Sequence, residues 1–293
     1  FVNIIGNPNV GKSTLMNALV GEKLSIITSK AQTTRHRILG IVNEDNYQIV
    51  FSDTPGVIKP SYELQNSMMN FVQSAFQDAD VILWILDVSE PPQKPDFYIA
   101  ETINNGRADA KVILVFNKDD LTTEKTDFSA FEGLIEHDVT VKVSALEEDG
   151  IDTLLDTVIE KLPLGPRYYP IDQVSDLNMR FISAEVVREK VILNTEKEIP
   201  HSVAVEITEY KDRETRTDIY AVIYVEKDSQ KGIVIGKGGK MIKTIGTEAR
   251  MDLEKMLDRQ VLLDLRVKVL KNWRSNEQFM RRVGYKLPKE GEE

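Results

Sequence analysis

The chain has 293 residues, of which 41% are hydrophobic and 29% charged, a composition typical of a globular protein with about two domains. It contains no cysteine, which excludes disulfide bonds and cysteine metal sites, and its three histidines are scattered. No apolar run approaches the roughly 18 residues of a membrane-spanning helix, and no signal peptide is visible, so we expect a cytoplasmic protein.

The net charge of −10 is unevenly distributed along the sequence. Residues 227–286 carry 15 Lys and Arg against 7 Asp and Glu, whereas residues 1–226 carry 21 against 37. A basic segment on an acidic protein suggests a polyanionic partner for that segment alone.

Residues 1–164 alternate between strand and helix patterns. Buried strands are predicted at 2–5, 47–53, 81–87, 111–117 and 139–145, with helices near 12–20, 62–77, 95–105, 127–136 and 150–162. This alternation predicts an α/β domain with a doubly wound, mostly parallel sheet. A further run at 35–43 is separated from the strand at 47–53 only by "EDN", which predicts an antiparallel hairpin and hence one antiparallel strand.

Three prolines in "LPLGPRYYPID", Leu162 to Asp172, break regular structure, and we assign residues 165–176 to a linker. The order then changes to helix (178–196), two strands (201–210 and 218–227), short helix, glycine-rich turn, helix (240–257), strand (261–271) and helix (275–283). This α-β-β-α-α-β order predicts a smaller α+β domain at 177–286, followed by a tail at 287–293.

The first strand ends in "GNPNVGKST", Gly6 to Thr14, which fits the phosphate-loop pattern G-x-x-x-x-G-K-[ST] between a strand and a helix. The loop amides and the helix N-terminus attract phosphates, Lys12 can reach the β- and γ-phosphates, and Ser13 offers a hydroxyl to Mg²⁺. The predicted nucleotide contacts of this loop are Asn7, Asn9, Val10, Gly11, Lys12, Ser13 and Thr14.

Two later motifs select the base. In "NKDD", Asp120 can accept hydrogen bonds from guanine N1–H and the 2-amino group, which adenine lacks, while Asn117 braces the loop and the Lys118 stem covers the ring. In "SAL", Ser144 to Leu146, the Ala145 amide can donate to guanine O6. These residues predict GTP and GDP as ligands.

Two further motifs predict a nucleotide-dependent switch. Asp53 of "DTPG" can hold Mg²⁺ through water, and the Gly56 amide can sense the γ-phosphate. In "TTR", Thr34 is the predicted Mg²⁺ ligand, with Thr33 as the alternative. We assign catalysis to Lys12, Thr34 and Gly56, so the sequence predicts a GTPase.

Two positions bear on the hydrolysis rate. Ras-type GTPases carry a glutamine after the glycine of this motif, whereas here Val57 cannot orient water, so we predict slow intrinsic turnover. Asn9 is either a surface residue in a turn or a ligand for K⁺, as in GTPases that resemble this chain at that position.

A second glycine-rich loop, "VIGKGGKMIKTIG" from Val234 to Gly246, lacks phosphate-loop spacing and offers no hydroxyl after Lys240. A G-x-x-G turn between two helices instead indicates a KH domain of the second type, which binds single-stranded RNA; a simple interhelical turn is the alternative. The predicted RNA contacts are Ile235, Gly236, Lys237, Gly238, Gly239, Lys240, Ile242 and Lys243. Arg274, Arg281, Arg282 and Lys286 either extend the phosphate track or are merely solvated.

With these motifs in this order, the whole chain closely resembles the bacterial Era GTPase family, a GTPase domain followed by a KH domain. The resemblance implies a role in assembly of the small (30S) ribosomal subunit, RNA binding near the 3′ end of 16S rRNA, and peripheral association with the inner face of the cell membrane. We expect a monomer that requires Mg²⁺. The alternative function is a nucleotide-gated RNA-binding module in which hydrolysis is incidental.

Overall fold

The structure, a computed structural model, describes residues 1–30 and 32–285. Its contacts divide the chain into two compact units. The first contains Phe1–Ile27, Thr34–Ser61 and Gln65–Asp176, and the second contains Thr28–Thr33, Tyr62–Leu64 and the chain from Leu177 onward. Lys286 and the tail at 287–293 lie outside the described residues.

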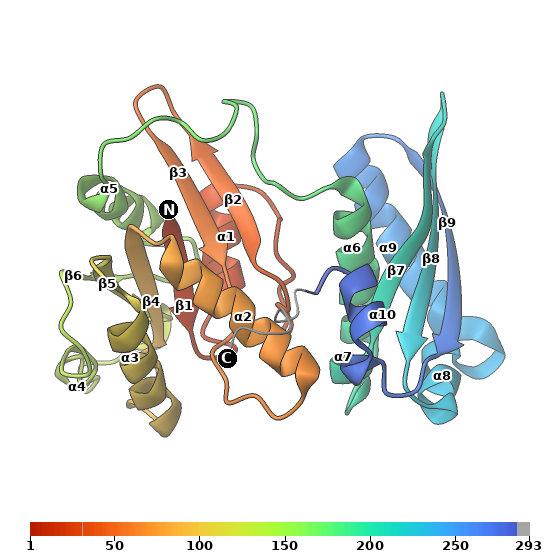
Figure 1. The fold of residues 1–293 in the computed structure, drawn as a ribbon, viewed down its shortest axis with the longest axis horizontal. Helices are drawn as coiled ribbons and strands as arrows, with labels where there is room; N and C mark the ends of the chain where they lie inside the picture. Colours follow the sequence, from red (N-terminus) through yellow and green to blue (C-terminus); the bar gives the residue numbers. More distant parts are fainter. Residues whose placement is uncertain (31, 286–293) are drawn as a thin grey trace. The chain divides into compact units, whose positions relative to one another are not determined.

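The first unit is built on a six-stranded sheet with the order β2-β3-β1-β4-β5-β6 (Figure 1). Its strands are β1 (Val2–Gly6), β2 (Ile38–Asn43), β3 (Gln48–Asp53), β4 (Val81–Asp87), β5 (Lys111–Asn117) and β6 (Val139–Lys142). Only the β2–β3 pair is antiparallel; Ile38 lies opposite Asp53 and Asn43 opposite Gln48. The predicted α/β sheet with one antiparallel strand is confirmed.

Helices cover both faces of this sheet, which explains why its central strands are apolar along their whole length (Figure 1). Residues of β4 and β5 pack with α2 (Glu63–Gln77), α3 (Lys94–Gly106) and α4 (Ser129–Glu132) on one face. The other face is covered by α1 (Lys12–Val20) and α5 (Ile151–Lys161), and a 3-10 turn, η1 (Asp119–Leu121), follows β5. The sheet thus gathers the carboxyl ends of β1, β4 and β5 at one edge.

The helix predicted at 127–136 is wrong in length, because α4 has only four residues. Asp127 accepts hydrogen bonds from the amide and hydroxyl of Ser129, which starts the turn. The amide of Leu134 then donates to the carbonyl of Phe131, three residues back, so the α-helical pattern ends there. The apolar residues Phe131 and Ile135 are buried without a longer helix.

The second unit is a three-stranded sheet with the order β7-β8-β9, packed against helices. The elements are α6 (Met179–Asn194), α7 (Ile199–Ser202), β7 (Ala204–Asp212), β8 (Arg216–Val225), α8 (Asp228–Ile235), η2 (Lys237–Gly239), α9 (Lys240–Leu257), β9 (Gln260–Val269), η3 (Trp273–Ser275) and α10 (Glu277–Arg282). β7 and β8 are antiparallel, and β8 and β9 are parallel. The predicted KH order of elements is therefore confirmed, with α7 as an addition.

The short helix α7 displaces the start of the strand predicted at 201–210. Pro200 occupies the first turn of α7, where its missing amide costs no hydrogen bond, and the strand begins at Ala204. Apolar residues of α6, α9 and the sheet form one core, including Val187, Ile219 and Ile245. No helix in the described part of the chain is both long and apolar enough to cross a bilayer.

Candidate functional site

The phosphate loop joins β1 to α1 through backbone that favours glycine. Gly11 has φ 99°, and a Cβ added there would lie 2.2 Å from the Nδ2 atom of Asn117. Asn9, two residues earlier, also has a positive φ, 66°. The loop can therefore curl closely around a phosphate, and no larger residue fits at Gly11.

Lys12 is buried, and its Nζ atom donates a 2.7 Å hydrogen bond to the backbone carbonyl of Asn7. Burial lowers the pKa of Lys12 to about 8, although the nearby Asp53 carboxylate acts in the opposite direction. A bound phosphate would raise this pKa again and favour the ammonium form.

The three predicted magnesium-site residues come together from three segments. Ser13 Oγ donates to Asp53 Oδ2 at 2.7 Å and lies 2.9 Å from Thr34 Oγ1. Thr33, the alternative ligand, instead bonds to the carbonyl of Lys30 and the hydroxyl of Thr28. Thr34 is thus the threonine that lies beside Ser13 and Asp53.

The environment of Asp53 fits a magnesium ion. The residue is fully buried, and its Oδ1 atom has no hydrogen-bond partner among the described residues. Burial raises the pKa of this carboxyl, against the lowering effects of the Lys12 charge and the Ser13 hydrogen bond. A hard cation with its bound water would supply the missing partner and favour the carboxylate.

Asn117, at the end of β5, connects the predicted base loop to the phosphate loop. Its Nδ2 atom donates to the carbonyl of Val10 at 2.7 Å, and its Oδ1 atom accepts from the amide of Ala145 at 2.9 Å. The Ala145 amide, the predicted donor to guanine O6, is therefore engaged with Asn117 in this structure. Asn117 braces three motifs that are far apart in the sequence.

The other residues of the base loop lie at the surface, near the same carboxyl end of the sheet. Lys118 forms an ion pair with Asp87, the last residue of β4, and Asp120 and Leu146 are exposed. Although partial burial acts to raise it, the pKa of Asp87 is lowered by hydrogen bonds from Lys118 and Ser89. The lysine stem is thereby fixed, while the Asp120 carboxylate remains accessible to a base.

The DTPG loop approaches the phosphate loop closely. A Cβ at Gly56 would lie 2.9 Å from Pro8, so glycine is required for the contact. The side chain of Val57 is only 5% exposed and belongs to the core formed with β4 and α2. Val57 therefore contributes to the packing of this core.

The second glycine-rich loop forms a tight turn between α8 and α9. Gly236, Gly238 and Gly239 have φ values of 74°, 62° and 76°. No atom lies within 4 Å of a Cβ added at Gly238 or Gly239, so their backbone faces open space. Lys237, Lys240 and Lys243 are exposed around this turn, which creates a positive surface without bulky neighbours.

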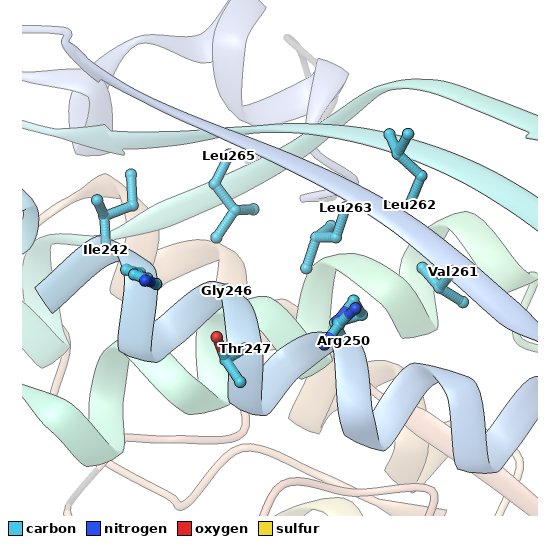
Figure 2. A pocket seen from close by; sticks show the side chains of 9 residues that line it. Ile242, Gly246, Thr247, Arg250, Val261, Leu262, Leu263 and Leu265 are labelled. Carbon is cyan, nitrogen blue, oxygen red and sulfur yellow. The ribbon is translucent and has the colours of Figure 1, made fainter. Parts of the chain in front are cut away.

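A groove of about 580 Å³ lies beside the turn, between α9 and β9 (Figure 2). Leu263 and Leu265 point from the strand toward the helix, where Lys243, Thr247 and Arg250 line the opposite side. An apolar strand facing polar and basic groups suits nucleobases whose backbone follows the lysines.

The groove only partly matches the predicted RNA contacts. Ile242 and Lys243 line it, whereas Ile235 packs against the core and is not among the lining residues. The sequence analysis missed the lining residues Gly246, Thr247, Arg250, Val261, Leu262, Leu263 and Leu265. The spacing from Lys243 to Thr247 and Arg250, which places all three on one helix face, was the signal that could have found two of them.

The C-terminal arginines have acidic partners. Arg274 pairs with Glu226 and Arg282 with Glu206, and Arg281 lies 3.7 Å from Glu277. These pairs fasten the C-terminal segment to the sheet and to itself, which favours a structural role over an extended phosphate track.

Comparison with known proteins identifies both parts of the chain. A family model described as a 50S ribosome-binding GTPase matches residues 1–118, and a KH domain model matches residues 198–274. The match thus extends over the phosphate loop, the switch motifs and the start of the base loop, and separately over the GKGG turn and groove.

Full-length relatives share both domains. The chloroplast GTPase ERA1 of Zea mays is 44% identical over 292 residues, which cover 97% of this chain and 70% of that protein. A crystal structure of an Aquifex aeolicus Era variant bound to GDP·AlF₄⁻ is 39% identical, covers 98% of both chains and superimposes with a TM-score of 0.90. A structure of Era with MgGDPNP and nucleotides 1506–1542 of 16S ribosomal RNA is 38% identical, with 98% coverage of both chains and a TM-score of 0.89. The chain is a GTP-hydrolysing enzyme and belongs to the Era GTPase family.

Proposed function

We propose that the chain is a GTP-switched assembly factor for the small (30S) ribosomal subunit that binds near the 3′ end of 16S rRNA through its KH domain. The observation that carries the proposal is at α9, whose N-terminus follows the open GKGG turn and whose side chains line one side of the groove. The Era relative in complex with a 16S rRNA fragment supports the same ligand.

For the nucleotide, we propose that the phosphate loop binds the phosphates and that Asn117, Lys118, Asp120 and residues 144–146 bind guanine. Mg²⁺ would be held by Ser13, Thr34 and, through water, Asp53, and it supplies charge neutralisation at the β- and γ-phosphates. Its support is the buried, partnerless Oδ1 atom of Asp53 and the MgGDPNP bound by the Era relative.

For hydrolysis, we propose that Lys12, Thr34 and the Gly56 amide stabilise the charge that develops on the γ-phosphate. Asn9 is the proposed K⁺ ligand, supported by its exposed position in the phosphate loop. Single-turnover hydrolysis faster in KCl than in NaCl is the expected result; equal rates would remove K⁺ from the mechanism.

The RNA proposal is tested with two exposed lysines of the turn. A variant with both Lys237→Gln and Lys240→Gln should bind a single-stranded 16S 3′-end oligonucleotide more weakly at low salt. Its slope of log affinity against log salt should be shallower by about 1.4, since each phosphate contact to single-stranded nucleic acid contributes about 0.7. Lys94→Gln with Lys125→Gln, exposed lysines of the first unit, is the matched control. An unchanged slope in the turn variant would contradict RNA binding at GKGG.

We further propose a monomer located in the cytoplasm and peripherally at the inner face of the cell membrane. The domain boundaries proposed for it are 1–164 for the GTPase domain, 165–176 for the linker and 177–286 for the KH domain. Co-flotation of the purified protein with vesicles of bacterial lipids tests the membrane contact, and absence of co-flotation would restrict the protein to the cytoplasm.

A further inference from the structure

The connection between β4 and α3 carries none of the nucleotide motifs, yet it lies between two of them. In the sheet, β4 is the neighbour of both β1, which ends in the phosphate loop, and β5, which ends in the base loop. Residues at the carboxyl end of β4 and the start of α3 are therefore beside the nucleotide site without belonging to its motifs.

Asp96, in the first turn of α3, reaches the phosphate loop from this position. Its side chain is 7% exposed, and each carboxylate oxygen accepts one hydrogen bond. Oδ1 accepts from Asn7 Nδ2 at 2.6 Å, and Oδ2 accepts from the backbone amide of Gln93 at 2.6 Å. One oxygen thus fixes the start of α3 and the other holds the phosphate loop.

Asn7 transmits this contact to the lysine that reaches the phosphates. Its backbone carbonyl accepts the 2.7 Å hydrogen bond from Lys12 Nζ. Its Oδ1 atom has no hydrogen-bond partner among the described residues, so Asp96 alone orients the side-chain amide. A continuous chain of hydrogen bonds therefore runs from Asp96 through Asn7 to Lys12.

The phosphate loop is consequently braced at both ends. Asn117 holds the carbonyl of Val10 near its end, and Asp96 holds Asn7 near its beginning. Asn117 belongs to a recognised base motif, whereas Asp96 belongs to none. A loop held at two points loses less conformational freedom when it closes on a phosphate.

We propose that Asp96 is a positioning residue for the phosphates, acting through Asn7 on Lys12, and that it does not contact the nucleotide. The inference rests on the proposed nucleotide site. Because the brace acts on the phosphate loop alone, its loss should weaken GDP binding without changing the preference for guanine.

The experiment is a double-mutant cycle on GDP affinity, measured by calorimetry on the full chain. Asn7→Ala and Asp96→Ala should each weaken GDP binding by about tenfold, within the range of one lost hydrogen bond to a charged group. The double variant should be no weaker than Asn7→Ala alone, since Asp96 acts on the phosphates only through Asn7. The ratio of GDP to inosine diphosphate affinity, which reports on the base loop, should remain that of the wild type.

Two further variants separate positioning from stability. Asp127→Ala removes a carboxylate that likewise accepts hydrogen bonds at a helix start, but it has no contact with the phosphate loop. It should leave GDP affinity unchanged, and Asp96→Asn, which keeps one acceptor oxygen, should fall between the wild type and Asp96→Ala. Thermal unfolding of each variant identifies any that is not folded. If Asp96→Ala is not folded, the GDP affinity of Asn7→Ala decides, because that variant keeps the hydrogen bond between Asp96 and the Gln93 amide.

Multiplicative losses in the double variant, or an altered preference for guanine, would overturn the positioning role. GDP affinities of the single variants equal to that of the wild type would overturn it as well. A wild-type chain that binds no GDP would instead overturn the proposed nucleotide site, and the positioning role with it.

Discussion

Lys12 combines burial with a charge that its proposed ligand requires. Its pKa is lowered to about 8 by burial, so the free protein loses this proton as the pH rises above about 8. Bound phosphates favour the ammonium form, so binding above this pH must take up a proton, and the GDP dissociation constant should rise by up to tenfold per pH unit. Below that pH the affinity should be flat.

Calorimetry with GDP in the absence of Mg²⁺ between pH 6.5 and about 9 measures this dependence. Asp53→Asn removes the carboxylate whose charge raises the pKa of Lys12, so the break should move to lower pH in that variant. A wild-type affinity that is flat up to pH about 9 would contradict the proton-uptake argument.

The sequence shows that Val57 cannot orient water, but it does not show where the side chain lies. Its side chain is buried in the core to which Val72 also belongs. Val57→Ala should reduce the free energy of unfolding by roughly 2 kcal/mol because it removes buried methyl groups. The single-turnover rate of the folded variant should change by less than about twofold, because the buried Val57 side chain has no hydrogen-bonding group with which to act on the attacking water.

Val72→Ala, in the same core but on α2, is the matched control and should behave alike in both measurements. A collapse of hydrolysis in Val57→Ala alone would mean that Val57 shapes the water site directly.

At the scale of elements, two glycines of one turn have different physical roles. A Cβ at Gly236 would lie 2.6 Å from the Cβ of Met241, whereas one at Gly238 meets no atom within 4 Å. Gly238 is in the left-handed region (φ 62°, ψ 25°), where alanine costs about 1 kcal/mol in strain. Gly236 (φ 74°, ψ 169°) is in a region that essentially only glycine adopts, so alanine there costs about 1–3 kcal/mol in backbone strain in addition to the steric contact.

Gly236→Ala should therefore lower the midpoint of urea unfolding of the KH domain clearly more than Gly238→Ala. Gly238→Ala should keep the fold but weaken binding of the single-stranded oligonucleotide, because its methyl group occupies the open face of the turn. Equal destabilisation by the two variants would contradict the extra backbone strain and the Met241 contact that set Gly236 apart.

The elements also show what local sequence can predict. Buried strands such as β4 and β5 are continuous apolar runs, so their pattern suffices. Gly11 of the phosphate loop and the three glycines of the GKGG turn stand at positions with positive φ, so their spacing suffices as well. The RNA groove was mostly missed because it needs β9 to face α9, a pairing decided by long-range packing and not by any motif. Asp96 was missed for the same reason, since its partner Asn7 lies 89 residues away.

At the scale of the whole molecule, a basic segment of net charge +8 follows an acidic one of −16, which confines the attraction for RNA to the KH end.

The proposed switch requires that nucleotide and RNA binding be coupled, and any such coupling must be reciprocal. If a non-hydrolysable GTP analogue changes the affinity for the 16S 3′-end oligonucleotide relative to GDP by some factor, the oligonucleotide must change the ratio of analogue to GDP affinity by the same factor. We expect a factor of about 5–150, the usual range of coupling between two sites. Calorimetric titrations in both directions measure it, and stimulation of single-turnover hydrolysis by the oligonucleotide should accompany it. Lys237→Gln with Lys240→Gln should weaken RNA binding in both nucleotide states and leave the factor unchanged, because these lysines are proposed RNA contacts outside the switch motifs. A factor of one, with hydrolysis unaffected by RNA, would favour the alternative of an RNA-binding module in which hydrolysis is incidental.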